Sequence, residues 1–182
     1  MLTMSIKKVK EQIVKYGKEL GFDLIKIGPA VLPDKYEAHF EKWLNDGGNA
    51  EMGYMANREK QNAEVLPNAK TVISLGINYF QGELTDELPN PLNLKGTEVI
   101  SNEGRVARYA VTRDYHKIIG KKLKQFAKYI EENFEAETKH YVDTGPILER
   151  AYGENAGIGY TGRNTCIITR EFGSWIFLAE IL

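Results

Sequence analysis

Apolar residues recur along the chain with two different periods, which predict helices and strands. Steps of three and four residues are typical of helices with one buried face, and capping residues and glycines mark their ends. The helices are predicted over residues 6–20, 33–45, 114–134 and 146–155. The strands are predicted over residues 22–27, 71–79, 166–170 and 174–181, and another strand ends at residues 141–143.

Two strand patterns decide the expected architecture. The run Thr71–Tyr79 is apolar without clean alternation, so both of its faces should be covered and it should be central in a sheet. The last two strands are expected to form a hairpin around Phe172 and Gly173. Together with the helices they predict a single α/β (α+β) domain over residues 1–182, a layered sandwich with a mixed sheet.

Composition narrows the class of protein. The 182 residues are 42% hydrophobic and 27% charged, which fits one folded domain, and the net charge of −1 gives no global attraction to nucleic acid. The N-terminus mixes charged and apolar residues at helical spacing, so neither a signal peptide nor a membrane anchor is expected, and we expect a cytoplasmic protein. The single cysteine, Cys166, rules out a disulfide, a four-thiolate zinc site and a cysteine-ligated iron–sulfur cluster. We expect a buried structural thiol there.

Residues 157–162 satisfy the pattern GxGxxG, but their context does not fit a dinucleotide site. A dinucleotide loop leaves a strand and enters a helix, whereas these glycines leave a helix and enter a strand. They permit close backbone approach to a bulky ligand. The alternative is a helix C-cap followed by a tight turn.

Asp143 stands at the end of a predicted strand, directly before the start of a helix. It is expected either to cap that helix or to act as a general acid at the edge of the sheet. Arg150 follows about two helical turns later and would orient an anionic or polar substrate, or lie on the surface.

A lysine stripe, formed by Lys117, Lys121, Lys124 and Lys128, runs opposite the apolar face of the helix 114–134. The arginines at 105, 108 and 113 precede it. Such a stripe is either a solvated helix face or a surface that binds a phosphate backbone. Tyr109 and Tyr115 would stack on bases or belong to the core.

Five segments in order resemble the epoxyqueuosine reductase family. They are VLPNAKTVISL at residues 65–75, RYA and RDYHK at residues 108–117, VDTGPILERA at residues 142–151, AGIGYTGRNT at residues 156–165, and GSWIFLAEIL at residues 173–182. The resemblance runs through the chain.

The resemblance implies a cobalamin-binding domain, related in fold to the cobalamin domains of reductive dehalogenases and to flavin nitroreductases. Family members reduce epoxyqueuosine in the tRNA anticodon loop to queuosine with base-off cobalamin. Their VDxGP aspartate, here Asp143, donates a proton to the departing oxygen. The resemblance implies that the cofactor-binding residues are Arg58, Ala107, Asp143, Gly159, Arg163, Asn164, Ile167, Thr169 and Ser174. The residues expected to bind the tRNA substrate are Arg113, Tyr115, Lys121, Lys124 and Arg150.

The resemblance also implies a further domain, which in the family ligates two [4Fe-4S] clusters. This chain stops at the strand that precedes it, so an external or missing-domain electron donor is expected, and the chain alone should not turn over. Two alternatives remain. One is a stand-alone cobalamin- or flavin-binding module, and the other is an RNA-binding domain that uses the lysine stripe.

Overall fold

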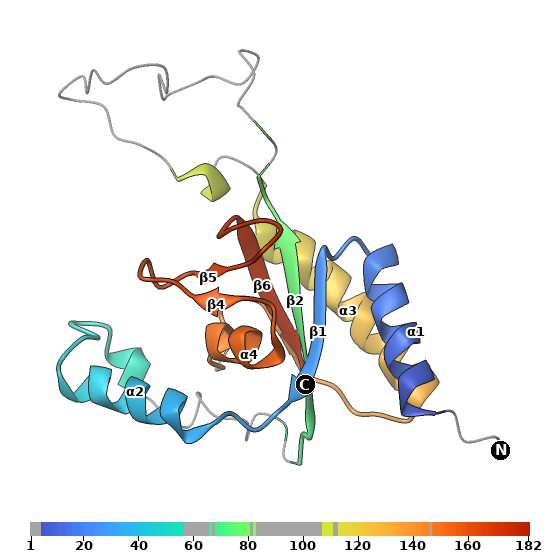
Figure 1. The fold of residues 1–182 in the computed structure, drawn as a ribbon, viewed down its shortest axis with the longest axis horizontal. Helices are drawn as coiled ribbons and strands as arrows, with labels where there is room; N and C mark the ends of the chain where they lie inside the picture. The colour runs from blue at the N-terminus through green and yellow to red at the C-terminus, as the bar shows by residue number, and fades with distance from the viewer. Residues whose placement is uncertain are drawn as a thin grey trace.

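A four-stranded antiparallel sheet covered by helices on both faces forms the centre of the computed structural model (Figure 1). The structure describes residues 5–56, 66, 68–80, 82, 107–110, 113–145 and 147–182. The helices are α1 (Ile6–Glu19), α2 (Asp34–Asn45), α3 (Tyr115–Phe134) and α4 (Glu149–Ala156), with short 3₁₀ turns η1 (Gly53–Ala56) and η4 (Arg108–Ala110). The strands are β1 (Leu24–Pro29), β2 (Thr71–Asn78), β3 (His140–Tyr141), β4 (Tyr160–Thr161), β5 (Ile167–Ile168) and β6 (Ile176–Ile181).

The main sheet has the strand order β1-β2-β6-β3, and each of its pairings is antiparallel. The predicted central position of β2 is confirmed, because β1 and β6 flank it and Val72, Ile73, Ser74 and Leu75 are buried. The expected mixed sheet is wrong. Strand direction depends on how the chain crosses over between strands, and the apolar period within a strand carries no information about it.

The expected hairpin between the last two strands is also wrong. β5 pairs with β4 in a separate two-stranded sheet, and β6 enters the main sheet between β2 and β3. A single bridge between Thr169 and Gly173 remains, in which the Thr169 N–H donates to the Gly173 carbonyl at 2.8 Å. The chain turns there and leaves one sheet for the other.

Most helix limits agree with the capping residues in the sequence. The Ser5 hydroxyl accepts from the Lys8 N–H at 3.5 Å at the start of α1, and Asp114 accepts from the His116 N–H at 3.0 Å at the start of α3. Pro33 is the N-cap of α2 rather than its first helical residue. The helix predicted over 146–155 begins later, at Glu149, whose side chain accepts the Asp143 N–H from the turn after β3.

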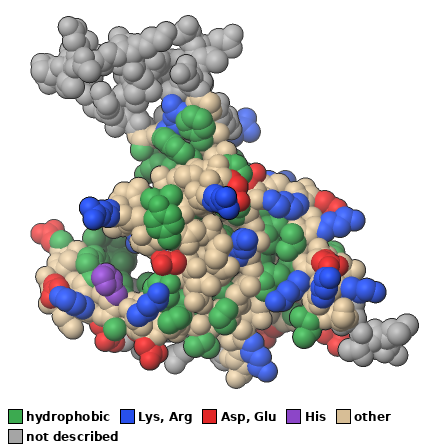
Figure 2. Space-filling view, viewed as in Figure 1, with side chains coloured by type: hydrophobic (Ala, Val, Ile, Leu, Met, Phe, Trp, Pro, Cys, Tyr) green, Lys and Arg blue, Asp and Glu red, His purple; other side chains and the backbone are tan. Residues whose placement is uncertain are grey.

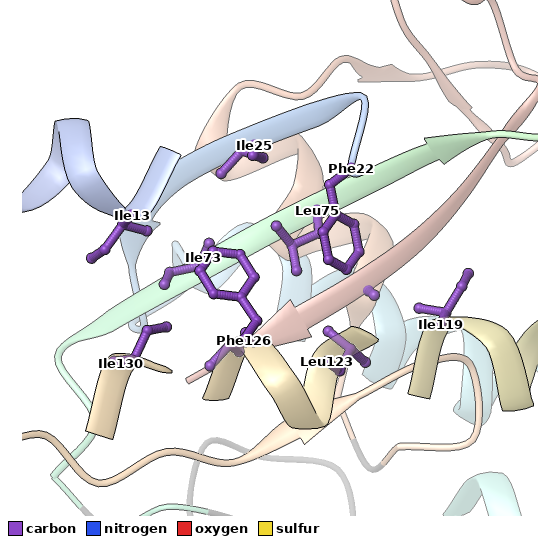
Figure 3. Close-up of a cluster of buried hydrophobic side chains, with 11 residues drawn as sticks. Ile13, Phe22, Ile25, Ile73, Leu75, Ile119, Leu123, Phe126 and Ile130 are labelled. Atoms are coloured by element: carbon purple, nitrogen blue, oxygen red, sulfur yellow. The ribbon is translucent and has the colours of Figure 1, made fainter. Parts of the chain in front are cut away.

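The main core lies between the sheet and the helices α1 and α3 (Figure 3). The predicted apolar face of α3 is confirmed, since Ile119, Leu123, Phe126 and Ile130 are buried. Gly17 lets α1 approach closely, because a Cβ atom there would lie 2.6 Å from Ile25 Cδ1. α4 covers the opposite face of the sheet and packs against β1, β2 and β6.

The molecular surface carries charges of both signs, and Figure 2 shows basic and acidic side chains interspersed on one face. An apolar groove of about 620 Å³ opens beside α1 and the last turn of α3, and is lined by residues such as Val9, Ile130 and Phe134. In the described residues, no helix is long and apolar enough to cross a membrane.

Candidate functional site

Asp143 lies in the turn between β3 and α4, with a left-handed backbone φ of 59°. Its N–H donates to Glu149 Oε1 at 2.5 Å, and its side chain is 58% exposed. The N-cap of α4 is Leu148, and α4 has no side-chain cap. The capping alternative for Asp143 is therefore wrong, and its carboxylate is available for other chemistry.

The Asp143 carboxylate is paired with His116, which the sequence reasoning did not single out as a site residue. Asp143 Oδ2 lies 2.9 Å from His116 Nε2, and Asp114 Oδ1 lies 2.9 Å from His116 Nδ1. The hydrogen bond to Asp143, followed by that to Asp114, raises the pKa of His116 above its ordinary value of 6.5. The hydrogen bond from His116 in turn lowers the pKa of Asp114. The two carboxylates thus favour the charged form of the imidazole.

The residues Asp114, His116 and Asp143 form an acid–base cluster. Tyr115 forms the apolar side of this cluster. Its ring stacks on His116 with centroids 4.0 Å apart and on Phe177 with centroids 4.1 Å apart. Burial, and next the nearby Asp143 carboxylate, raise the pKa of the Tyr115 phenol well above 10. Its hydroxyl therefore keeps its proton at neutral pH and lies close to Asp143. Of the two alternatives for this residue, core packing describes its ring better than an exposed stacking platform does.

An aromatic strip leads away from the acid–base cluster along the end of the sheet. It consists of Phe177, Tyr79, Trp175, Phe80 and Tyr109. It passes from Phe177 to Tyr79 at 4.5 Å and from Tyr79 to Trp175 at 5.7 Å between ring centroids. The Arg108 guanidinium lies over the Phe80 and Trp175 rings, at 4.9 and 5.5 Å from their centroids. Tyr109, Phe80 and Trp175 are each at least 40% exposed, so the strip offers apolar surface next to Asp143.

The glycine-rich segment follows α4, as the sequence predicted. Gly157 is the left-handed C-cap of α4, with a φ of 85°, and the chain then enters β4. A Cβ atom on Gly159 would lie 2.3 Å from the Ile168 carbonyl oxygen, so this glycine is required by the pairing of β4 with β5. The helix-cap alternative therefore explains Gly157, and the close pairing of β4 with β5 explains Gly159.

The other residues that the resemblance assigns to a cofactor differ in exposure. Ile167 and Thr169 are buried, and the Thr169 hydroxyl already donates to the Gly173 carbonyl and accepts from the Phe172 N–H. Ala107, Arg163 and Asn164 are exposed, Ser174 is partly buried, and Arg58 lies outside the described residues. Their assignment to a cofactor remains a prediction.

The structure also tests what the sequence predicted for Cys166 and Arg150. Cys166 is exposed, so the expected buried thiol is wrong; the apolar character of the strand after it suggested burial, but Cys166 lies in the turn before β5. Arg150 donates to the Thr165 carbonyl at 2.5 Å, so it ties α4 to the turn before β5. Its expected contact with substrate remains a prediction.

The lysine stripe is exposed along α3, as its spacing predicted. Lys117 lies 4.0 Å from Asp114, and Lys128 lies 3.5 Å from Glu132, so both ends of the stripe are near carboxylates. Lys121 and Lys124 lie between them, and Arg113 is exposed just before the helix. Among the residues the structure describes, no group of three or more His, Cys, Asp or Glu is arranged to hold a metal ion.

The large apolar groove and the acid–base cluster lie at opposite ends of α3. The groove is lined by the last turn of the helix, at Ile130 and Phe134, whereas Tyr115 and His116 occupy its first turn. The groove contains none of the candidate site residues, so its size alone does not mark it as the reactive site.

The pairing of His116 with Asp143 predicts a measurable shift. In Asp143→Asn we expect the pKa of His116 to fall, because the carboxylate that contributes most to raising it is gone. An NMR titration of the imidazole signals measures this shift, and His39 and His140 serve as internal references. An unchanged His116 titration in the folded variant would contradict the pairing.

The fold and the cluster together define a class of protein, an α/β domain with a hydrogen-bonded group of carboxylates and an imidazole at the end of its sheet. The family model described as "Epoxyqueuosine reductase QueG, DUF1730" matches residues 60–144. The epoxyqueuosine reductase of Synechocystis is 39% identical over 151 residues, which are 82% of this chain and 48% of that protein. The enzyme of Escherichia coli is 34% identical over 185 residues, which cover 98% of this chain and 46% of that protein. The chain belongs to the epoxyqueuosine reductase family.

Solved structures agree with this assignment. The epoxyqueuosine reductase of Streptococcus thermophilus has a TM-score of 0.74 and 30% identity, and the match covers 96% of this chain and 45% of that one. An epoxyqueuosine reductase solved with an epoxyqueuosine-modified tRNA stem loop has a TM-score of 0.72 at 24% identity, over 97% of this chain and 45% of that one. The chain spans about half the length of the relatives it matches.

Proposed function

We propose that this chain provides the substrate chamber and the proton donor for the cobalamin-dependent reduction of epoxyqueuosine to queuosine in tRNA. The observation that carries the proposal is the hydrogen-bonded chain from Asp114 through His116 to Asp143, with both contacts at 2.9 Å. Membership of a family whose named members are epoxyqueuosine reductases supports the reaction. The solved relative with a modified tRNA stem loop supports tRNA as the substrate class.

The reaction requires protons that these side chains can supply. Converting an epoxide to an alkene takes two electrons and two protons and releases the oxygen as water. We infer that the His116 imidazolium passes its Nε2 proton to the Asp143 carboxylate, and that Asp143 donates this proton to the epoxide oxygen as the C–O bond breaks. Water supplies the second proton. Asp114 keeps the imidazole oriented and stabilises its positive charge.

The exposed rings next to Asp143 support the binding of a bulky cofactor with a flat apolar face, such as a corrin. The aromatic strip offers exposed ring faces, and the exposed Asp143 carboxylate lies next to it. Bound cobalamin would supply the electrons for the reduction. Trp175 and Tyr109 would contact its apolar parts, and Arg163 and Asn164 offer polar groups for its periphery.

The placement of the lysine stripe supports a route for the tRNA backbone. The stripe is carried by the same helix whose first turn holds His116, so phosphates bound at Lys121 and Lys124 would lie along α3 from the acid–base cluster. Exposed lysines and arginines bind the sugar–phosphate backbone through charge, without reading sequence. We propose that they position the tRNA, while the cluster acts on the modified base.

Cofactor binding tests the proposal directly. We expect the purified chain to bind cob(II)alamin and to shift its absorbance to the base-off form. Trp175→Ala should weaken binding, because it removes an exposed ring of the aromatic strip. Asp143→Asn should retain binding. Absence of binding at cofactor concentrations on the order of tens of micromolar, or preferential uptake of FMN to give a yellow protein, would contradict the proposal.

A further inference from the structure

A carboxyl group is buried in the main sheet without a hydrogen-bond partner among the described residues. Glu180 in β6 is 0% exposed, and neither of its carboxyl oxygens has a partner in that part of the chain. Ser74 lies directly opposite it in β2, is also 0% exposed, and its hydroxyl has no partner there either. Two polar side chains thus occupy a position in the sheet where apolar ones are usual.

These groups lie on the face of the sheet that α4 covers. Ile73, Leu75 and Ile181 join the core beneath α1 and α3, so their neighbours Ser74 and Glu180 point to the opposite face. α4 packs against β2 and β6 on that face. The buried carboxyl therefore lies in the layer beneath the helix that begins at Glu149.

Glu149 connects this layer to the candidate active site. Its Oε1 accepts the Asp143 N–H at 2.5 Å, at the residue whose φ is 59°. A left-handed backbone is strained for most side chains and is retained where surrounding contacts hold it. The Glu149 carboxylate is such a contact, because it fixes the turn from which the Asp143 side chain reaches His116.

Glu149 is partly buried, and Glu180 beneath it is fully buried. Burial is the main cause that raises the pKa of Glu149 to about 7, and the charge of Asp143 also raises it, whereas the hydrogen bond from the Asp143 N–H and the charges of Arg150 and His116 lower it. Burial, and next the charge of Glu149, raise the pKa of Glu180 well above its ordinary value. The Tyr152 hydroxyl on α4 donates to the Ala30 carbonyl at 2.9 Å, so that bond does not satisfy Glu180.

We propose that Glu149 is a positioning residue of the active site, which holds the Asp143 turn in place through its carboxylate, above the buried Glu180. The proposal rests on the proposed function, since Asp143 is the residue being positioned. When Glu149 is ionised it accepts the Asp143 N–H as a strong, charge-assisted acceptor. When it is protonated that bond weakens and the turn is released. Glu149 thereby couples the geometry of the proton donor to pH near neutrality.

The Asp143 amide signal reports the proposed bond directly. In a ¹⁵N-labelled sample of the chain we expect this amide proton to resonate downfield, and to move with an inflection near pH 7, where Glu149 ionises. In Glu149→Gln the inflection should disappear. The matched control is Glu154→Gln, the same change in the same helix at a carboxylate that binds the Thr161 hydroxyl, and it should retain the inflection.

Two further variants exclude titration of His116 and misfolding as explanations of the result. In His116→Gln the inflection should persist, which separates the titration of Glu149 from that of the imidazole. If Glu149→Gln does not fold, Glu149→Asp shortens the side chain by one methylene and should abolish the downfield position. An inflection that persists in folded Glu149→Gln would overturn the positioning role. This measurement needs neither cofactor nor turnover, so a failure here is separate from a failure of the proposed reaction.

Discussion

Replacing Asp143 by Asn is expected to lower the rate of epoxide reduction by roughly 10²–10⁴-fold, the usual contribution of a positioned general acid. Asparagine has nearly the same shape and tolerates a left-handed backbone, but it has no acidic proton to give. The measurement is a single-turnover assay with cobalamin, a strong chemical reductant and an epoxyqueuosine-containing stem loop. The chemical reductant supplies the electrons.

The control for this experiment is cofactor and stem-loop binding, which should remain within a few-fold of the unmodified chain. The loss should then appear in the rate of the chemical step and not in substrate affinity. If Asp143→Asn reduces the epoxide at a near-normal rate with both ligands bound, Asp143 is not the proton donor.

Replacing Glu180 by Gln is expected to change how the free energy of unfolding depends on pH. Glu180 has a raised pKa in the folded protein, so above the ordinary value of 4.5 the folded state keeps a proton that the unfolded state releases. The contribution of Glu180 to the free energy of unfolding is fully present below pH 4.5. It declines as pH rises, by about 1.4 kcal/mol per pH unit, until the pKa of Glu180 in the folded state is reached. Glutamine has no such proton, so the variant should gain stability relative to the unmodified chain as pH rises from 5 to 8.

Denaturant unfolding at several pH values measures this difference. Glu137→Gln is the matched control, because Glu137 is exposed and its removal should leave the pH dependence unchanged. A difference between Glu180→Gln and the unmodified chain that stays constant over this range would show that Glu180 titrates like an exposed carboxyl.

The sequence predicted those parts of the fold that depend on local pattern. The apolar face of α3 follows from the spacing of Leu123, Phe126 and their neighbours, and the buried central strand β2 follows from the apolar run Thr71–Tyr79. The capping residue Ser5 located the start of α1. The helix predicted from Asp114 begins one residue later, at Tyr115, because Asp114 is its N-cap. These features require only residues that are close together in the chain.

The features that the sequence did not reveal depend on contacts between distant segments. Nothing local shows that β6 lies between β2 and β3, or that β5 pairs with β4. His116 and Asp143 are 27 residues apart, and only the packing of the start of α3 against the turn after β3 brings them together. The available signal was the capping residue Asp114, which places His116 in the exposed first turn of a helix.

The backbone at Asp143 restricts the identity of this residue independently of its chemistry. A φ of 59° favours glycine, asparagine and aspartate, whose side chains are absent or short, over longer ones. Of these three, only aspartate carries an acid. Glutamate would keep the carboxyl group but would be strained at this φ. Glycine would adopt this φ easily but has no carboxyl group. The backbone of this turn therefore restricts which residues position 143 accepts. The need for an acidic proton and the need for a left-handed φ both select aspartate.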